Sequence, residues 1–237
     1  MIKVFIGFDP RQPVAANVLA HSIQVNSTKP VAITFLNLKQ LPITRKGLTD
    51  FTYSRFLVPW LSEYEGHSVF VDSDFVCLGD ISNLIAISLL ERIKEGSPET
   101  SVWVSKNKLK YEWASLMVFD NEQCKILTPE YVQDEANSLF DFAWAKRVGE
   151  LPGEWNFLVG YDEAVPRILP KMIHYTQGIP VWPETKDCDY SGEWKYLSLE
   201  SRSSVSFGAL MGRSVHAKPV HDKLRQDLSG PKDTHCV

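Results

Sequence analysis

The sequence contains no hydrophobic run long enough to cross a membrane, because polar residues interrupt every apolar stretch. It also shows no excess of basic charge: 25 Lys and Arg stand against 29 Asp and Glu, a formal net charge of -4. A general nucleic-acid-binding protein would carry a basic face, so that class is disfavoured. The balance gives no reason to expect attraction to anionic membranes, although peripheral membrane contact stays open.

Cysteine is scarce, with four residues in the chain and no Cys-x-x-Cys pair. This spacing disfavours a zinc or redox cluster and indicates free thiols in a reducing compartment. The N-terminal residues become polar within nine positions, which is too short for a signal peptide. We therefore expect a cytoplasmic protein.

The composition is that of an ordinary globular protein, with 44% hydrophobic and 23% charged residues over 237 positions. This length is sufficient for one large domain with its own core. We expect a single domain over residues 1–200, followed by a polar tail over 201–237 that is loosely packed.

Strand and helix signals alternate from the start of the chain to residue 74. The expected strands span 2–8, 31–36 and 68–71, and the expected helices span 14–25 and 50–64. Pro59 is expected to kink or end the second helix. This alternation predicts an α/β fold with a mostly parallel sheet and helices on both faces.

The pattern is weaker in the second half of the chain. Two further strands are expected at 101–105 and 115–119, and a helix is expected over 129–144, beginning at Pro129. Residues 150–200 are expected to be irregular, and a short helix is expected at 220–228.

The most informative stretch is Val-Phe-Val-Asp-Ser-Asp at 69–74, where an apolar strand ends in two carboxylates. Ligands of open α/β sheets gather at the carboxyl ends of strands. Two such anions repel each other unless a cation or a proton lies between them, and oxygen ligands suit magnesium or manganese. Asp72 and Asp74 are therefore candidate metal ligands; the alternative is that they only cap the following turn.

The surrounding residues resemble glycosyltransferase family 8. Tyr-Ser-Arg-Phe-Leu-Val-Pro at 53–59, the strand and Asp-x-Asp at 69–74, and Leu-Gly-Asp-Ile at 78–81 match the core of that family in order and spacing. Phe-Ile-Gly-Phe-Asp at 5–9 resembles its first strand and nucleoside-binding loop. His-Tyr-Thr-Gln-Gly-Ile-Pro-Val-Trp at 174–182 resembles its metal-binding histidine segment.

The resemblance implies a GT-A-type fold, a UDP-sugar-like donor, and sugar transfer with retention of anomeric configuration. The sequence does not name the acceptor, which could be a glycan, a lipid-linked glycan or a protein. The resemblance makes His174 the third metal ligand beside Asp72 and Asp74, and an imidazole in this set favours Mn²⁺ over Mg²⁺. Arg55 is expected to pair with phosphate or with the carboxylates. The remaining nucleotide-sugar-binding candidates are Phe8, Asp9, Tyr53, Ser73, Ser115, Asn156 and Gly178.

The match is imperfect in two segments. The family lysine before Pro-Trp is missing, and Pro180 stands in its place, so Arg55, Lys186 or another cation is expected to substitute. The family's Asp-Gln-Asp segment is only partly echoed at 132–137, where Val132 replaces the leading aspartate. These departures indicate a divergent member, whose donor need not be that of its relatives.

Two other function classes stay open. A haloacid-dehalogenase-type phosphatase also has an apolar strand followed by Asp-x-Asp. It needs a second pair of acidic residues later in the chain to complete its metal site, and the one candidate pair in this sequence is Asp162-Glu163. The missing lysine keeps open a non-catalytic module that binds nucleotide-sugar or glycan.

Overall fold

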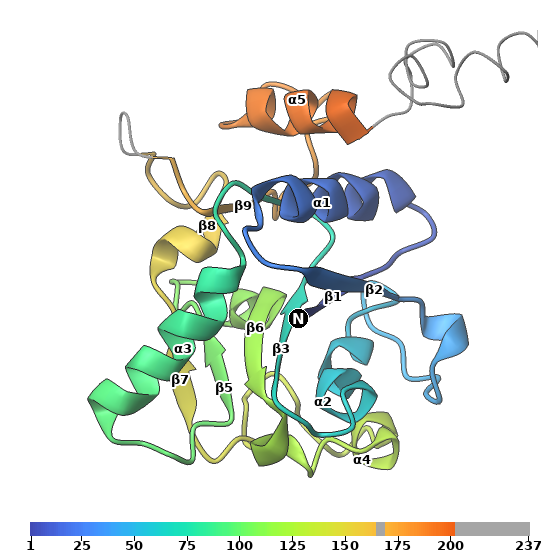
Figure 1. Ribbon diagram of the computed structural model, residues 1–237. Helices are drawn as coiled ribbons and strands as arrows, with labels where there is room; N and C mark the ends of the chain where they lie inside the picture. Colours follow the sequence, from blue (N-terminus) through green and yellow to red (C-terminus); the bar gives the residue numbers. More distant parts are fainter. Residues whose placement is uncertain (165–168, 202–237) are drawn as a thin grey trace, which may run out of the picture.

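A computed structural model describes residues 1–164 and 169–201 (Figure 1). The strands are β1 (Ile2–Gly7), β2 (Val31–Leu36), β3 (His67–Val71), β4 (Phe75–Cys77), β5 (Val102–Val104), β6 (Leu116–Asp120), β7 (Val148–Glu150), β8 (Phe157–Leu158) and β9 (Met172–His174). The α-helices are α1 (Pro13–Asn26), α2 (Val58–Leu61), α3 (Ser82–Glu95), α4 (Pro129–Gln133) and α5 (Ser191–Ser201).

The main sheet has six strands in the order β2-β1-β3-β6-β5-β7. β1 is parallel to β2 and β3, and β5 is parallel to β7, whereas β6 is antiparallel to both of its neighbours. The prediction of a mostly parallel sheet is therefore confirmed. The carboxyl ends of β1, β2 and β3 meet at one edge of the sheet, which is where an α/β sheet places its ligands.

Successive residues of the central strands point to opposite faces of the sheet, and each face has its own core. Val4 and Val69 pack with α1 and α3 on one face, whereas Phe5 and Phe70 pack with α2, α4 and the loops around them on the other. Helices cover both faces, as the alternation of strand and helix signals predicted (Figure 1).

A second sheet, in the order β4-β9-β8, lies beside α1 and completes the fold around the Asp-x-Asp turn. Its residues share a third core with α1 and α5 that includes Val76, Ile173 and Trp194. In Figure 1, α5 lies against α1 on the side away from the main sheet. Residues 150–200 were expected to be irregular, and this was wrong for the part that forms α5. Only Trp194, Leu197 and Ser198 of α5 are buried, so the helix has a weak amphipathic pattern.

The helix expected over 50–64 is split. A turn leads into a 3-10 helix at Ser54–Leu57, and only Val58–Leu61 is α-helical. Pro59 has no N–H to donate to the preceding turn, which favours this break. The chain then leaves the helix through positive φ angles at Glu63 and Tyr64.

The helix expected over 129–144 is also shorter than predicted, because α4 ends at Gln133. Nη1 of Arg45 donates hydrogen bonds to the carbonyl groups of Val132, Asp134 and Asn137, at 3.1, 2.8 and 3.2 Å. These carbonyl groups are the acceptors that a continuing helix would need. A long-range arginine has replaced the helical hydrogen bonds, and a local pattern cannot reveal such a partner.

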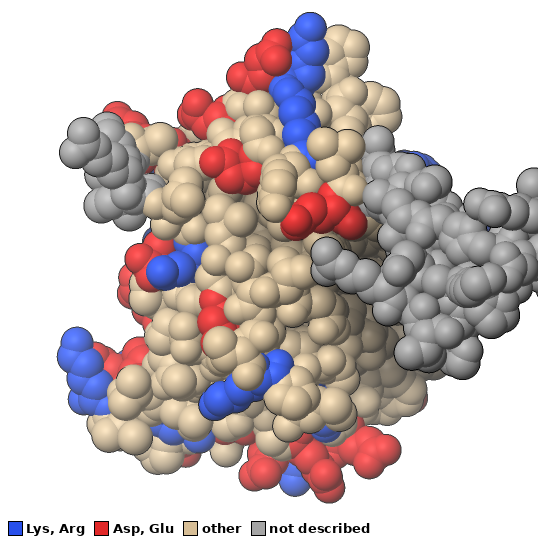
Figure 2. Space-filling view, turned by 45° about the horizontal axis from the view of Figure 1, so that its top comes forward, with Lys and Arg blue, Asp and Glu red and all other residues tan. Residues whose placement is uncertain are grey.

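Within residues 1–164 and 169–201, no helix has the length and apolar character needed to span a membrane. On the face drawn in Figure 2, the described Lys and Arg residues are interspersed with Asp and Glu and form no broad basic patch. The predicted tail began at residue 201, but Ser201 is the last residue of α5. The rest of the tail, with the short helix expected at 220–228, lies outside the described residues.

Candidate functional site

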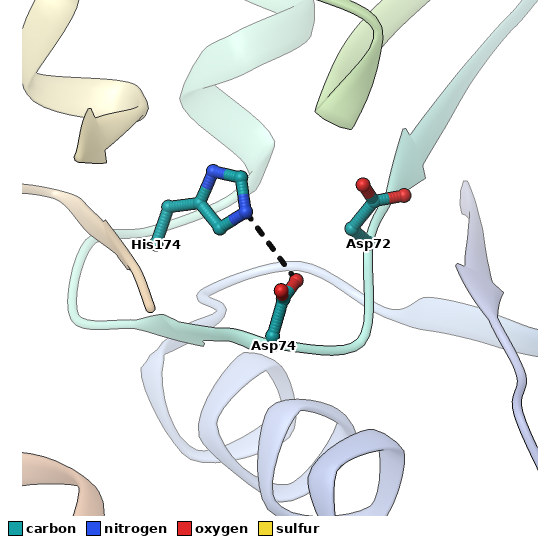
Figure 3. A group of neighbouring side chains, drawn as sticks. All are labelled: Asp72, Asp74 and His174. Carbon is teal, nitrogen blue, oxygen red and sulfur yellow. Dashed lines mark ion pairs between the residues drawn. The ribbon is translucent and has the colours of Figure 1, made fainter. Parts of the chain in front are cut away.

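Asp72, Asp74 and His174 converge although a hundred residues separate the first and the last (Figure 3). β3 ends at Val71, and Asp72 and Asp74 occupy the turn into β4. β4 pairs with β9 so that Phe75 faces His174, and the N–H of Tyr175 donates to the carbonyl of Asp74 at 2.9 Å. One potential ligand atom from each of the three residues lies within 4.8 Å of the others.

The imidazole of His174 is held in a single orientation. It stacks on the ring of Phe75, with centroids 4.1 Å apart and planes 17° from parallel. Its Nδ1 lies 3.1 Å from Oδ1 of Asn156, whose Nδ2 donates to the carbonyl of Glu112 at 3.1 Å. The donation to Glu112 fixes the amide of Asn156, so its oxygen accepts Nδ1–H, and this leaves Nε2 of His174 directed at Asp74.

Nε2 of His174 lies 3.4 Å from Oδ1 of Asp74, the interaction drawn in Figure 3. Burial disfavours the charged imidazole, but the nearby carboxylates of Asp74, Glu112 and Asp72 outweigh burial and raise the pKa of His174. A neutral imidazole nitrogen and a carboxylate oxygen at this separation are also the donor types that a divalent transition metal takes together.

Asp72 is paired with Arg55. Nη2 of Arg55 lies 3.0 Å from Oδ1 of Asp72, and Nη1 donates to Oδ2 at 3.2 Å. Nη1 also donates to the carbonyl of Ala114 at 2.8 Å. Burial nevertheless raises the pKa of Asp72 to about 7, since desolvation exceeds the attraction of Arg55 and Asp74 adds repulsion. Arg55 was expected to pair with phosphate or with the carboxylates, and in the structure it pairs with the carboxylate of Asp72.

The three residues fit a divalent cation. Oδ1 of Asp72 and Oδ1 of Asp74 are buried, and each has a single ionic contact, with Nη2 of Arg55 at 3.0 Å and with Nε2 of His174 at 3.4 Å, but no hydrogen bond from the described residues. Buried carboxylate oxygens usually have several partners, and two repelling carboxylates become stable together when a cation lies between them. Two carboxylate oxygens and one imidazole nitrogen suit Mn²⁺, and they leave coordination positions open for a ligand.

Glu112 is a buried carboxylate at the same site that sequence reasoning missed. It lies in the 3-10 helix Lys110–Ser115. Its Oε1 accepts from the hydroxyl of Thr176 at 2.6 Å, and its Oε2 lies 3.9 Å from Nδ1 of His174. Its Oε2 also accepts from Ser115 at 3.2 Å. No local motif marks Glu112; only its position before the strand at 116–120 could have drawn attention to it.

The predicted nucleoside-binding residues lie at the carboxyl end of β1. Asp9 is buried, and both of its carboxylate oxygens are taken by Arg11, a residue that sequence reasoning missed. Phe8 is half-buried and packs against Phe35 at the end of β2, with ring centroids 5.8 Å apart. Tyr53 lies elsewhere, with the guanidinium of Arg45 3.9 Å above its ring.

The four remaining candidates have different surroundings. Ser73 is buried in the Asp-x-Asp turn, and the hydroxyl of Ser115 is directed to the carbonyl of Glu112. Asn156 is buried against His174, so its amide is committed to the imidazole. Gly178 has a φ of +116°, which a residue with a side chain rarely adopts.

A cleft of about 470 Å³ opens next to Asn156. The rings of Phe157 and Tyr190 line it and meet edge to face, with centroids 5.2 Å apart. Lys106 and Lys108 lie on its wall together with carboxylates, including that of Glu154. Lys186, the sequence candidate for the missing lysine, is exposed and lies 3.9 Å from Asp187.

The late acidic pair needed by the phosphatase alternative does not join the metal group. Oδ2 of Asp162 accepts from the N–H of Leu158 at 2.8 Å, and Asp162 and Glu163 line the cleft instead. In the part of the chain that the structure describes, the one group of acidic, histidine or cysteine residues with metal-binding geometry is Asp72, Asp74 and His174.

A curated relative decides the family. Protein CDI of Arabidopsis thaliana is 34% identical over 224 residues, covering 81% of this chain and 84% of its own length. The chain belongs to the Protein CDI family. No protein-family model matches the chain.

Several solved structures resemble this member of the Protein CDI family, and they are glycosyltransferases. The bifunctional glycosyltransferase WbbM gives a TM-score of 0.63 at 18% identity, over 83% of this chain and 49% of WbbM. GlyE of Streptococcus pneumoniae gives 0.62 at 15% identity, over 84% of this chain and 61% of GlyE. The chain thus spans about half of WbbM and less than two thirds of GlyE.

The galactosyltransferase LgtC, solved in complex with donor and acceptor sugar analogs, gives a TM-score of 0.57 at 10% identity, over 87% of this chain and 98% of LgtC. These likenesses show that the fold is the GT-A fold of glycosyltransferases, as the resemblance to family 8 implied.

Proposed function

We propose that this protein is a metal-dependent glycosyltransferase that transfers a sugar from a UDP-sugar to an acceptor, with retention of anomeric configuration. The observation that carries the proposal is the buried group of Asp72, Asp74 and His174 at the carboxyl end of β3, in a GT-A fold. LgtC, which shares the fold, binds donor and acceptor sugar analogs, and this supports a similar pair of ligands.

Asp72, Asp74 and His174 would hold one Mn²⁺ or Mg²⁺ ion. When bound, such an ion supplies Lewis-acid stabilisation to the diphosphate of the donor. Asn156 keeps Nε2 of His174 free to bind by accepting Nδ1–H. Arg55 partly balances the charge of Asp72 in the buried site and so favours the ionised carboxylate that the metal would bind.

We propose that the acceptor is a glycan, a lipid-linked glycan or a protein. The cleft is lined by Asn156, which contacts His174, and by the aromatic rings of Phe157 and Tyr190 and several polar side chains. Ligand sites commonly combine an apolar surface with a few polar groups in this way. Cytoplasmic location stays a prediction; the three cysteines in the described residues, Cys77, Cys124 and Cys188, are free thiols.

The test is release of UDP from a panel of UDP-sugars by the purified protein, with Mn²⁺ and with EDTA. We expect slow release that requires Mn²⁺ and is lost in Asp74→Asn, a change that removes the ligand charge and keeps the shape. Asp80→Asn is the matched control, since Asp80 accepts from the N–H of Ser82 at the start of α3, outside the metal group.

Two outcomes separate the alternatives. Binding of UDP without release from any UDP-sugar, also with candidate acceptors, would favour the non-catalytic binding module. Hydrolysis of p-nitrophenyl phosphate that is lost in Asp74→Asn would favour the phosphatase, because a glycosyltransferase is not expected to hydrolyse a simple phosphate ester.

A further inference from the structure

Asp9 and Arg11 form an ion pair that leaves the carboxylate buried and the guanidinium at the surface. Nε of Arg11 donates to Oδ1 and Oδ2 of Asp9 at 2.9 and 3.0 Å, and Nη2 donates to Oδ2 at 2.5 Å. The backbone N–H of Arg11 also donates to Oδ1 at 2.9 Å. The side chain of Asp9 is 5% exposed and that of Arg11 is 67% exposed. Hydrogen bonds from Arg11 lower the pKa of Asp9, so the pair stays charged.

This pair lies at the same sheet edge as the metal group. β1 and β3 are parallel neighbours, and Ile6 pairs with Val71, so the next residues along the two strands are Gly7 and Asp72. The ring of Phe51 covers Gly7 so closely that a Cβ there would lie 2.5 Å from it. The carbonyl of Phe51 accepts from Nε of Arg55 at 3.4 Å. Phe51 therefore lies between the end of β1 and Arg55.

The geometry of the pair gives Arg11 a property that a free surface arginine lacks. A bidentate contact holds the guanidinium close to the plane of the carboxylate and fixes the direction of its flat faces, while the side chain stays 67% exposed. Guanidinium planes stack on aromatic systems and on nucleobases, whereas a lysine ammonium offers no such plane. Phe8 and Phe35 add an apolar surface at the ends of β1 and β2.

We propose that Arg11 is the residue on which the nucleobase of the donor stacks, and that Asp9 is a positioning residue that fixes the plane of Arg11. This inference rests on the proposed function, since it needs a nucleotide at this edge of the sheet. It also changes the role expected for Asp9 from sequence, because both carboxylate oxygens that would contact the nucleoside are engaged with Arg11.

The test compares UDP with inorganic pyrophosphate, which has the diphosphate but no base, by calorimetric titration in the presence of Mn²⁺. Arg11→Lys keeps the positive charge and removes the flat face. We expect this variant to bind UDP about 10-fold more weakly and pyrophosphate with an affinity like that of the wild-type protein. Asp9→Asn loosens the hold on Arg11, and we expect a smaller loss for UDP alone.

Arg147→Lys is the matched control, because Arg147 also forms an ion pair at the surface, with Glu95 at 3.2 Å, next to β7 at the far side of the sheet. It should change neither affinity. Equal losses for UDP and pyrophosphate in Arg11→Lys would assign Arg11 to the phosphates and overturn the proposal, as would unchanged binding of both. A wild-type protein that binds pyrophosphate and not UDP would contradict the proposed function itself.

Discussion

The side-chain oxygen of Asn156 lies 3.1 Å from Nδ1 of His174, and this contact decides which nitrogen of the imidazole faces Asp74. Asn156 is in turn fixed by its own donation to the carbonyl of Glu112. Asn156 does not face the metal group itself, but it sets the orientation of His174 and the ring nitrogen of His174 that carries the proton.

Replacing Asn156 with Ala should weaken binding of Mn²⁺ by about 10- to 100-fold, the usual cost of losing the partner that orients a histidine ligand. Electron paramagnetic resonance of free Mn²⁺ during titration measures this. Asn121→Ala is the control, because Asn121 is also buried and donates to Glu65 and Ser68 away from the site. Equal Mn²⁺ affinity in Asn156→Ala and Asn121→Ala would count against the orienting role.

Arg55 should contribute strongly to stability, because removing it leaves the buried Asp72 without its counter-charge. Arg55→Met is expected to lower the free energy of unfolding by about 3 kcal/mol at pH 8. The loss should be smaller at pH 5.5, where Asp72 is protonated. Urea denaturation measures both values, and Arg147→Met should change them by less than about 0.5 kcal/mol. A pH-independent loss would mean that Arg55 acts mainly through packing on Phe70, whose ring centroid lies 5.0 Å from the guanidinium carbon.

The raised pKa of Asp72 predicts how stability and metal binding depend on pH. Without metal, the folded state holds a proton on Asp72 up to about pH 7, whereas the unfolded carboxyl has a pKa of 3.8. This group therefore stabilises the fold below pH 4, and its contribution is lost as the pH rises through about 7. The raised pKa of His174 acts in the same direction.

Binding of Mn²⁺ must displace these protons, so its affinity should rise between pH 5.5 and pH 8. Thermal unfolding across this range, with EDTA and with Mn²⁺, measures both trends. The apo protein should lose stability with rising pH relative to Asp72→Asn, while the shift caused by Mn²⁺ grows. A shift from Mn²⁺ that does not change with pH would argue against Asp72 as a ligand.

Gly7 should not tolerate a side chain, because its Cβ would lie 2.5 Å from the ring of Phe51. Gly7→Ala is expected to cost about 1–3 kcal/mol of stability and to weaken UDP binding, since Phe51 also contacts Arg55. Gly153→Ala is the control, with nothing within 4 Å of the added Cβ. Chemical denaturation measures the stability of the two variants, and calorimetry measures their affinity for UDP. Equal values for Gly7→Ala and Gly153→Ala would contradict a role for the contact between Gly7 and Phe51.

The first half of the fold could be predicted because its strands and α1 carry clear periodic patterns. Val31–Leu36 was predicted to the residue, and the apolar strand before Asp72 placed the acidic pair at the right edge of the sheet. The second half depends on distant partners. Arg45 ends α4 from eighty-seven or more positions away, and α5 is a helix because Trp194 and Leu197 are buried with the residues of β9.

The candidate site was predictable where a motif carries the chemistry and hidden where only packing does. Asp72, Asp74 and His174 follow from the resemblance to family 8, and the structure brings them together. Glu112 and Arg11 belong to no motif used in the sequence analysis. Their positions depend on a 3-10 turn and on an ion pair, which have no periodic signature.

The most direct test of the metal-dependent nucleotide site is calorimetric titration of UDP into the purified protein, with Mn²⁺ and with EDTA. The site predicts binding that requires Mn²⁺ and disappears in the double variant Asp72→Ala, Asp74→Ala. Binding of UDP that is the same in EDTA and in the double variant, or no binding in either condition, would contradict it.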